Sequence, residues 1–270
     1  MNNLKKKIYF HVGLAKTGST FLQKNFFPYL KNIKYISTHK YKKCINIINN
    51  TNHKSYLISR EFDRQLETEV KKILSHFPQT KIIVIFREHG KWISSQFKRL
   101  SKNGWHWGFK DFYNNENTGY WKNEDMIYSK KIDIINKYSN SKSLILRFEE
   151  LKSDPHSYLK KISDYTNSSY IKEEISLSVV HKSYSEKQLI FLKSFCKIFK
   201  KNPPKYHANN KFKHWLLFRP WWLLYHLVMY FSIIIPKKYI VKKPLIDKQY
   251  LEKCMIKYKE DWEKVLKLSE

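Results

Sequence analysis

One short segment near the N-terminus combines a lysine, two glycines and several hydroxyl side chains. Gly13 and Gly18 bracket a turn that contains Lys16, and Ser19 and Thr20 follow it directly. Backbone N–H groups in such a turn, aided by a nearby positive charge, bind the oxygens of phosphate groups. The segment therefore predicts a binding site for a phosphate-bearing ligand.

The position of the lysine separates this segment from an ordinary nucleotide-binding P-loop. A Walker A loop has its lysine directly after the second glycine, followed by a serine or threonine that holds Mg²⁺. Here Ser19 follows Gly18, and Lys16 lies two residues before that glycine. We therefore expect no metal at the site. The simpler alternative is that Thr17 or Ser19 only caps a helix.

Strands alternate with helices around this segment. The apolar pattern predicts strands at 7–12, 33–37, 55–59, 81–86 and 143–148, and helices at 18–30, 41–49, 64–77, 90–102 and 125–138. Such alternation is typical of an α/β fold with an open parallel sheet flanked by helices. The remainder of the chain is predicted to be mostly helical.

A second candidate for phosphate binding follows the strand 81–86. Ligands of open parallel sheets bind at the carboxyl ends of the strands, where Arg87 lies. Ser95 comes eight residues later, in the next helix, and the two side chains together could hold a phosphate. The alternative is that Arg87 merely pairs with Glu88.

These residues resemble motifs of a known family. Lys-Thr-Gly-Ser-Thr-Phe after a strand resembles the 5′-phosphosulfate loop of sulfotransferases that use 3′-phosphoadenosine 5′-phosphosulfate (PAPS), with Ala15 in place of the usual proline. Arg87 and Ser95 match the 3′-phosphate motif of that family, in which Glu88-His89 replaces the usual Asn/Asp-Pro. The resemblance implies a P-loop-like sulfotransferase domain of the bacterial glycan type.

The resemblance also implies roles for individual residues. Lys16 would neutralise the charge that develops on the donor phosphate during transfer, and Phe21 would stack on the adenine. The 5′-phosphate would be held by Thr17, Gly18, Ser19 and Thr20, and the 3′-phosphate by Arg87 and Ser95. Lys182 is a weaker candidate for contact with a phosphate. The implied reaction moves a sulfuryl group from PAPS to an acceptor hydroxyl or amine, without a metal.

The general base is assigned to Glu61. Glycan-modifying members of the family have a glutamate in the region after the strand 55–59, whereas members that act on small hydroxyl compounds have a histidine there. The alternative is that Glu61 caps a helix from Asp63 or pairs with Arg60. His11, at the end of the first strand, is interpreted as a packing residue.

Aromatic residues between two glycines suggest the acceptor. Trp105, His106 and Trp107 lie between Gly104 and Gly108. Aromatic faces suit sugar rings, although these side chains could equally be part of a core. We expect a glycan, a glycolipid or a polysaccharide precursor as the acceptor.

The chain of 270 residues has a net charge of +29, from 52 basic and 23 acidic residues, which favours an anionic partner. Codon bias toward lysine is an alternative cause. The lysines are dispersed and no nucleic-acid-binding motif is present, so nucleic acid is not expected. Cys44, Cys196 and Cys254 are widely spaced and odd in number, which favours a reducing, cytoplasmic compartment.

The predicted organisation is a single domain over 1–270, with a nucleotide-binding α/β core at 1–150 and a helical part at 151–270. The segment 215–236 is strongly apolar. Pro220 is expected to start its helix, leaving about 24 Å of helix, short of the ~30 Å hydrocarbon core of a bilayer. Flanking lysines suit a helix that lies on an anionic membrane surface. The alternative is a core helix.

Two other function classes stay open on sequence grounds. A P-loop kinase of nucleosides or small molecules would need Mg²⁺, a GK[ST] element and an acidic strand end. A non-enzymatic basic protein would bind nucleic acid or anionic membrane without using Lys16. The loop lacks GK[ST] and no predicted strand ends in aspartate, which disfavours the kinase.

Overall fold

The computed structural model describes residues 6–178, 184–199 and 211–269. The chain forms two compact units, each built from segments that are separate in the sequence. Unit 1 comprises 1–92, 124–180 and 257–270, and unit 2 comprises 93–123 and 181–256. Each unit contains residues from before and after position 150. The predicted division of the chain near residue 150 is therefore not a boundary between the two units. The extent of the functional domain stays a prediction.

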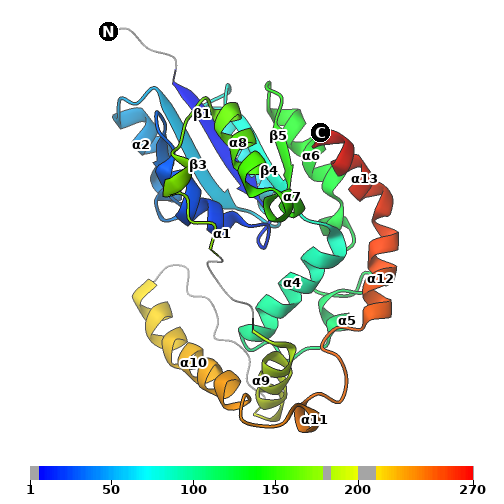
Figure 1. The fold of residues 1–270 in the computed structure, drawn as a ribbon. Coiled ribbons are helices and arrows are strands. Elements are labelled where there is room, and N and C mark those ends of the chain that lie inside the picture. Colours follow the sequence, from blue (N-terminus) through cyan, green and yellow to red (C-terminus); the bar gives the residue numbers. More distant parts are fainter. Residues whose placement is uncertain (1–5, 179–183, 200–210, 270) are drawn as a thin grey trace. The chain divides into compact units, whose positions relative to one another are not determined.

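Unit 1 contains a parallel sheet of five strands (Figure 1). The strands are β1 (Lys7–Gly13), β2 (Lys34–Ile36), β3 (Ser55–Glu61), β4 (Lys81–Phe86) and β5 (Leu144–Arg147), in the order β2-β3-β1-β4-β5. All four neighbouring pairs are parallel. The predicted open parallel α/β sheet is therefore confirmed, and β4 has the predicted bounds.

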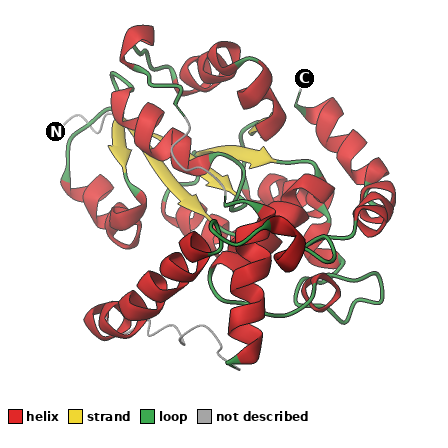
Figure 2. Cartoon of the chain, turned by 60° about the horizontal axis from the view of Figure 1, so that its bottom comes forward, coloured by secondary structure: helices red, strands yellow, loops and turns green. Residues whose placement is uncertain are grey.

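Helices cover both faces of this sheet, as Figure 2 shows. They are α1 (Ser19–Phe21), α2 (Cys44–Asn50), α3 (Leu66–His76), α6 (Tyr128–Tyr138), α7 (Phe148–Ser153), α8 (Pro155–Thr166) and α13 (Lys259–Leu268). Side chains alternate between the two faces along each strand. Tyr9 therefore packs in a cluster with Leu159 of α8, whereas Phe10 stacks on Tyr41 on the opposite face.

The segment predicted as one helix over 18–30 is helical but divided. Three residues of α1 are followed by a π-helical turn, Leu22–Phe26, and a 3₁₀ turn, Phe27–Tyr29. Pro28 lies in the 3₁₀ turn and has no N–H to donate, so a regular α-helix cannot continue through it. The π turn directly follows the glycine-containing segment.

Unit 2 is helical. It contains the later part of α4 (His89–Lys102), and α5 (Phe109–Phe112), α9 (Glu186–Ile198), α10 (Lys211–Phe231), α11 (Lys237–Ile240) and most of α12 (Lys248–Lys257). A capping box of Ser185 and Gln188 begins α9, which packs against α10. The buried side chains of α10 include Tyr225 and Met229.

The prediction that Pro220 starts a helix was wrong. The helix begins at Lys211 and Pro220 lies inside it. Proline removes the hydrogen bond to the carbonyl four residues earlier, that of Leu216. Both residues are exposed, so water can satisfy this carbonyl and the helix continues. Within the described ranges, no helix has the length and apolar character required to cross a membrane.

Candidate functional site: the β1–α1 loop and its neighbours

The loop between β1 and α1 lies at the carboxyl edge of the sheet, between the ends of two neighbouring strands. Gly13 is in register with Glu61 at the end of β3 and with Ile85 near the end of β4. The topology thus brings the Lys16 loop, Glu61 and Arg87 to one edge of the sheet. The sequence predicts that they converge at this edge.

Two residues of the loop have left-handed backbone conformations. Lys16 has φ 73° and Gly18 has φ 87°. This conformation costs a non-glycine residue on the order of 1–2 kcal/mol, so the loop holds Lys16 under strain while its side chain stays exposed. A Cβ on Gly18 would lie 2.9 Å from Leu151 and 3.0 Å from Phe148, so α7 leaves room only for glycine.

Hydrogen bonds fix the backbone of the loop to its surroundings. Ala15 N donates to Asp63 Oδ1 at 2.9 Å, and Ala15 O accepts from Trp92 Nε1 at 2.8 Å. Lys16 O accepts from Arg87 Nη1 at 3.2 Å. The strained loop conformation is therefore maintained by residues that follow β3 and β4. Sequence reasoning missed Asp63 and Trp92, although a polar residue just past a strand end could have pointed to Asp63.

Arg87 is mostly buried at the end of β4. Its guanidinium lies 4.8 Å from the ring centre of Phe148, and its Nε is buried without a hydrogen-bond partner. Burial lowers the pKa of Arg87, and the charge of Glu149 opposes this shift. Among the described residues, the Nε–H of Arg87 therefore has no acceptor, and it lies beside the loop that contains Lys16.

The sequence also allowed Arg87 to pair with Glu88. In the structure, the Arg87 guanidinium donates to the loop instead. The Glu88 carboxylate instead accepts from the backbone N–H groups of Gly90 at 2.8 Å and Lys91 at 3.3 Å, at the start of α4. Glu88 thus satisfies backbone N–H groups at the start of α4, and the Arg87 guanidinium contacts the loop.

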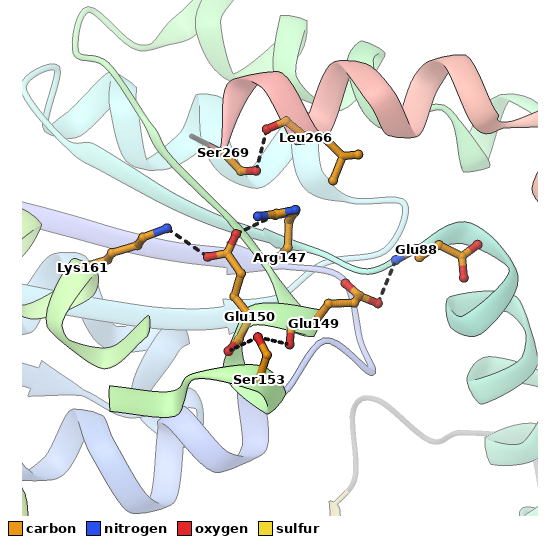
Figure 3. Close-up of polar contacts among 8 residues, drawn as sticks. All are labelled: Glu88, Arg147, Glu149, Glu150, Ser153, Lys161, Leu266 and Ser269. Carbon is orange, nitrogen blue, oxygen red and sulfur yellow. Dashed lines mark hydrogen bonds and ion pairs between the residues drawn. The ribbon is translucent and has the colours of Figure 1, made fainter. Parts of the chain in front are cut away.

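A carboxylate lies next to Arg87 at the start of α7. Glu149 Oε1 accepts from Glu88 N at 3.3 Å, and its Oε2 is buried without a hydrogen bond (Figure 3). In the same view Glu150 accepts from both Arg147 and Lys161. The negative charge of Glu149 thus acts on the Arg87 guanidinium.

Glu61 is the last residue of β3 and is half-buried. The alternative that it caps the following helix was wrong, since α3 begins at Leu66 with Gln65 at its N-cap position. The position of Glu61, in register with Gly13, fits a base that acts beside the loop. Its catalytic role stays a prediction.

The hydroxyl groups of the loop lie inside it. Thr17 and Ser19 are buried, and Thr17 Oγ1 donates to Leu14 O at 2.6 Å and lies 3.4 Å from Ser19 Oγ. Gly18 occupies the N-cap position of α1 without a side-chain cap, so the alternative that Thr17 or Ser19 caps this helix was wrong. Thr20 is half-buried. Phe21, the predicted adenine platform, is partly buried against the core.

The remaining predicted residues lie in unit 2 or outside the described part of the chain. Ser95 is half-buried on α4, and its pairing with Arg87 stays a prediction. Lys182 falls outside the described residues. Trp105 contacts Trp107 and Tyr120, with ring centres 4.5 Å and 5.4 Å apart. His106 has a buried Nδ1 without a hydrogen bond.

A hollow of about 550 Å³ opens beside these aromatic residues. It is lined by Trp107, Asp111, Asn114, Thr118, Gly119 and Tyr120. Trp107 and Tyr120 are 43% and 41% exposed, so their faces are accessible. Within the described residues, no group of three or more His, Cys, Asp or Glu side chains is arranged to hold a metal ion.

Comparisons with known proteins agree with the predicted fold and with the predicted kind of enzyme. The model of the sulfotransferase family matches residues 49–171, a segment that includes Glu61, Arg87 and Ser95. A sulfotransferase from Alicyclobacillus acidocaldarius is similar in structure, with a TM-score of 0.52 and 11% identity, over 73% of this chain and 97% of that one. No curated protein sequence matches the chain.

Mouse sulfotransferase SULT7A1 in complex with PAP aligns with a TM-score of 0.43 and 18% identity, over 74% of this chain and 68% of that one. The family match favours a sulfotransferase over the kinase and the non-enzymatic alternatives. The P-loop-like open sheet with flanking helices is confirmed. The chain therefore matches the sulfotransferase family over residues 49–171 and has a fold similar to that of a solved sulfotransferase.

Proposed function

We propose that this enzyme transfers a sulfuryl group from PAPS to a hydroxyl or amine of a glycan, a glycolipid or a polysaccharide precursor. The observation that carries the donor assignment is the hydrogen bond from Arg87 to Lys16 O. It joins the two segments that resemble the 5′ and 3′ phosphate motifs of PAPS-dependent enzymes. This bond brings two motifs that are 71 residues apart in the sequence into contact, which supports a shared site.

In the proposed reaction, the acceptor oxygen or nitrogen attacks the sulfur, and the bond from sulfur to the bridging oxygen of the 5′-phosphate breaks. The electron pair of that bond stays on the phosphate, as in phosphoryl transfer. Lys16 neutralises the developing charge, which can contribute about 3–4 kcal/mol of transition-state stabilisation. Glu61 accepts the acceptor proton. The products are the sulfated acceptor and adenosine 3′,5′-bisphosphate.

The surroundings of Arg87 support a role on the 3′-phosphate. Its buried Nε donates to no group of the described protein, and the guanidinium presents a planar fork that suits phosphate oxygens. A bound phosphate would supply the negative charge that Glu149 supplies in its absence. Ser95 is proposed as the second ligand of this phosphate.

The hollow beside Trp107 supports a carbohydrate acceptor. Two accessible aromatic faces, those of Trp107 and Tyr120, adjoin the polar side chains of Asp111, Asn114 and Thr118. Sugars present apolar ring faces and hydroxyl groups together, which such a lining matches. Trp105, which contacts both aromatic residues, and the neighbouring His106 complete the proposed acceptor region.

We also propose that the enzyme is cytoplasmic and binds peripherally to an anionic membrane surface through α10. One side of this helix is buried in unit 2, while Leu223 and Leu227 on another side are 54% and 59% exposed. A helix that is apolar all round needs a second apolar partner. Exposed lysines follow the helix, at positions Lys237, Lys238, Lys242 and Lys243. Anionic lipid headgroups complement both this cluster and the net charge of +29.

The function is tested by following label from [³⁵S]PAPS into a panel of oligosaccharides, lipid-linked glycans and phenols in the presence of EDTA. The proposal predicts label in a glycan acceptor. Lys16→Met should lower the rate about a hundredfold or more, while Lys24→Met, at an exposed lysine on the same segment, should not. Label in phenols alone would contradict the acceptor class, and Mg²⁺-dependent phosphoryl transfer from ATP would contradict the reaction.

A further inference from the structure

A buried tyrosine contacts the backbone of Arg87. Tyr128 is the first residue of α6 and is 0% exposed. Its hydroxyl donates to Arg87 O at 2.8 Å. The strand β4 ends at Phe86, so this carbonyl lies just past the end of the strand. Tyr128 therefore holds the backbone of the residue that is proposed to bind the 3′-phosphate.

The hydroxyl of Tyr128 acts as the donor in this bond. Burial raises the pKa of Tyr128 well above its usual value, and the charges of Glu88 and Glu149 add to the shift, so the hydroxyl keeps its hydrogen near pH 7. Phenylalanine would fill the same space with its ring. A buried hydroxyl costs free energy unless it forms a hydrogen bond. The hydroxyl is therefore better explained by its bond to Arg87 than by packing.

The ring of Tyr128 contacts residues on both sides of Arg87 in the chain. It stacks on Phe86 and on His89, with ring centres 4.7 Å and 4.0 Å apart and interplanar angles of 27° and 20°. No proline, which would fix a φ angle, lies between β4 and α4. The stacking and the hydrogen bond of Tyr128 instead hold the backbone that leads from the strand to the helix.

Tyr128 is itself held by the C-terminal helix α13. The Asp261 carboxylate accepts from Tyr128 N at 2.6 Å and lies 3.1 Å from His89 Nε2. The same nitrogen of His89 lies 2.9 Å from Met126 O. The tyrosine backbone and one of the rings that it stacks on thus share a single carboxylate. A shift of Tyr128 would break several buried contacts at once, so its hydroxyl has a well-defined position.

The guanidinium of Arg87 is held by fewer bonds than its backbone. Its Nη1 donates to Lys16 O at 3.2 Å, and its Nε has no acceptor among the described residues. The direction of the side chain therefore depends on where the backbone places it. A guanidinium binds a phosphate best when two N–H groups point at its oxygens together, so a small displacement of the arginine weakens the contact.

We propose that Tyr128 is a positioning residue, which holds the Arg87 backbone where the guanidinium can bind the 3′-phosphate of the donor nucleotide. The inference rests on the proposed use of PAPS. It adds to that site a residue that acts through Arg87 and does not touch the ligand.

The test compares two ligands that differ only in the 3′-phosphate. Titration calorimetry is carried out in EDTA with adenosine 3′,5′-bisphosphate and with adenosine 5′-monophosphate. Tyr128→Phe keeps the ring and removes the hydroxyl. We expect it to weaken bisphosphate binding about three- to tenfold and to leave monophosphate binding unchanged. An unchanged bisphosphate affinity would overturn the inference, and so would equal weakening toward the two ligands.

Tyr56→Phe is the matched control. Tyr56 is also 0% exposed in unit 1, and its hydroxyl donates to a backbone carbonyl, that of Thr51, at 2.7 Å. It lies near the start of β3, at the opposite edge of the sheet from the site. Its loss should lower stability and leave both affinities unchanged. If Tyr56→Phe weakened bisphosphate binding selectively, as Tyr128→Phe is expected to, the inference would fail.

A double variant tests whether Tyr128 acts through Arg87. When Arg87→Ala is already present, adding Tyr128→Phe should cause no further loss of bisphosphate affinity, because the guanidinium that the hydroxyl positions is gone. A further loss equal to that in the wild-type background would show an independent effect and overturn the inference.

The wild-type protein supplies a readout that does not depend on the folding of a variant. Since coupling between two sites is reciprocal, a ligand that needs Tyr128 in place should also hold it there. Exchange of the Tyr128 hydroxyl hydrogen, followed with tyrosine labelled with ¹³C at Cζ, should be slowed more by the bisphosphate than by the monophosphate. Equal exchange rates with the two ligands would overturn the inference. A wild-type protein that binds neither ligand would instead contradict the proposed function itself.

Discussion

At the scale of single residues, Lys16 combines a strained backbone with a side chain that is proposed to act in catalysis. Its left-handed backbone conformation is maintained by hydrogen bonds from Arg87 to its carbonyl and from Trp92 to the carbonyl of Ala15. A glycine at this position would adopt the same φ without a steric cost. The strain is consistent with a lysine that is kept for its charge.

Lys16→Gly should therefore increase the free energy of unfolding by about 1 kcal/mol relative to Lys16→Met, which keeps the strained conformation. Both variants should lose sulfuryl transfer, because both lack the ammonium group. Urea unfolding and the transfer assay measure the two effects. Equal stability of the two variants would show that the position is not strained.

The two glycines of the loop should respond in opposite ways to alanine. Gly18→Ala introduces a Cβ at a residue with φ 87°, within 3.0 Å of α7 side chains, so we expect a loss of about 1–3 kcal/mol. Gly13→Ala meets only ordinary contacts and should leave stability near that of wild type. Thermal unfolding distinguishes them, and a strongly destabilised Gly13→Ala would contradict the ordinary contacts expected at position 13.

At the scale of elements, one carboxylate joins the C-terminal helix to the sheet domain. Asp261 in the first turn of α13 accepts from the N–H groups of Tyr128 at 2.6 Å and Ser129 at 3.0 Å, at the start of α6. It also lies 3.1 Å from His89 Nε2, at the start of α4. Burial alone would raise the pKa of Asp261, but these hydrogen bonds outweigh it and lower the pKa to about 2.

A carboxylate whose pKa is lowered by folding stabilises the protein above its unfolded pKa, 3.8, and loses this contribution as the pH falls toward 2. Asp261→Asn should therefore cost about 2 kcal/mol of unfolding free energy at pH 7. The difference in unfolding free energy between Asp261→Asn and wild type should be about half as large at pH 3 as at pH 7. Denaturant unfolding at several pH values measures it. A difference that is the same at all pH values would contradict the electrostatic origin.

The sequence predicted those parts of the fold and site that depend on local pattern. Short stretches of sequence are enough to predict three of these features. They are the buried apolar run of β4, the glycine spacing of the loop, and the position of Arg87 at the end of a strand. Asp63 and Trp92 could not be predicted as partners of Ala15, because their contacts depend on how neighbouring strands are registered. The sequence did not predict that Pro220 lies inside α10. The helix continues through this proline only because water can reach the Leu216 carbonyl, and that exposure depends on the folded structure.

At the scale of the whole molecule, the exposed apolar side of α10 and the lysines at 237–243 predict binding to anionic vesicles. Leu223→Ser with Leu227→Ser should remove most co-sedimentation with vesicles that contain phosphatidylglycerol. Reversing the charge of Lys237 and Lys238 should weaken co-sedimentation with these vesicles, and the binding that remains should depend less on salt. Vesicles of neutral lipid should bind less. Binding that is unchanged in the double serine variant would contradict the proposed surface.

If the β1–α1 loop and Arg87 together hold a PAPS-type nucleotide without a metal, adenosine 3′,5′-bisphosphate should bind in EDTA. Calorimetric titration measures this binding. We expect binding by the wild type, weakening of about tenfold or more in Arg87→Ala, and no such weakening in Arg64→Ala, whose arginine pairs with Asp125 instead. The absence of binding in EDTA, with binding of ATP only when Mg²⁺ is added, would contradict it.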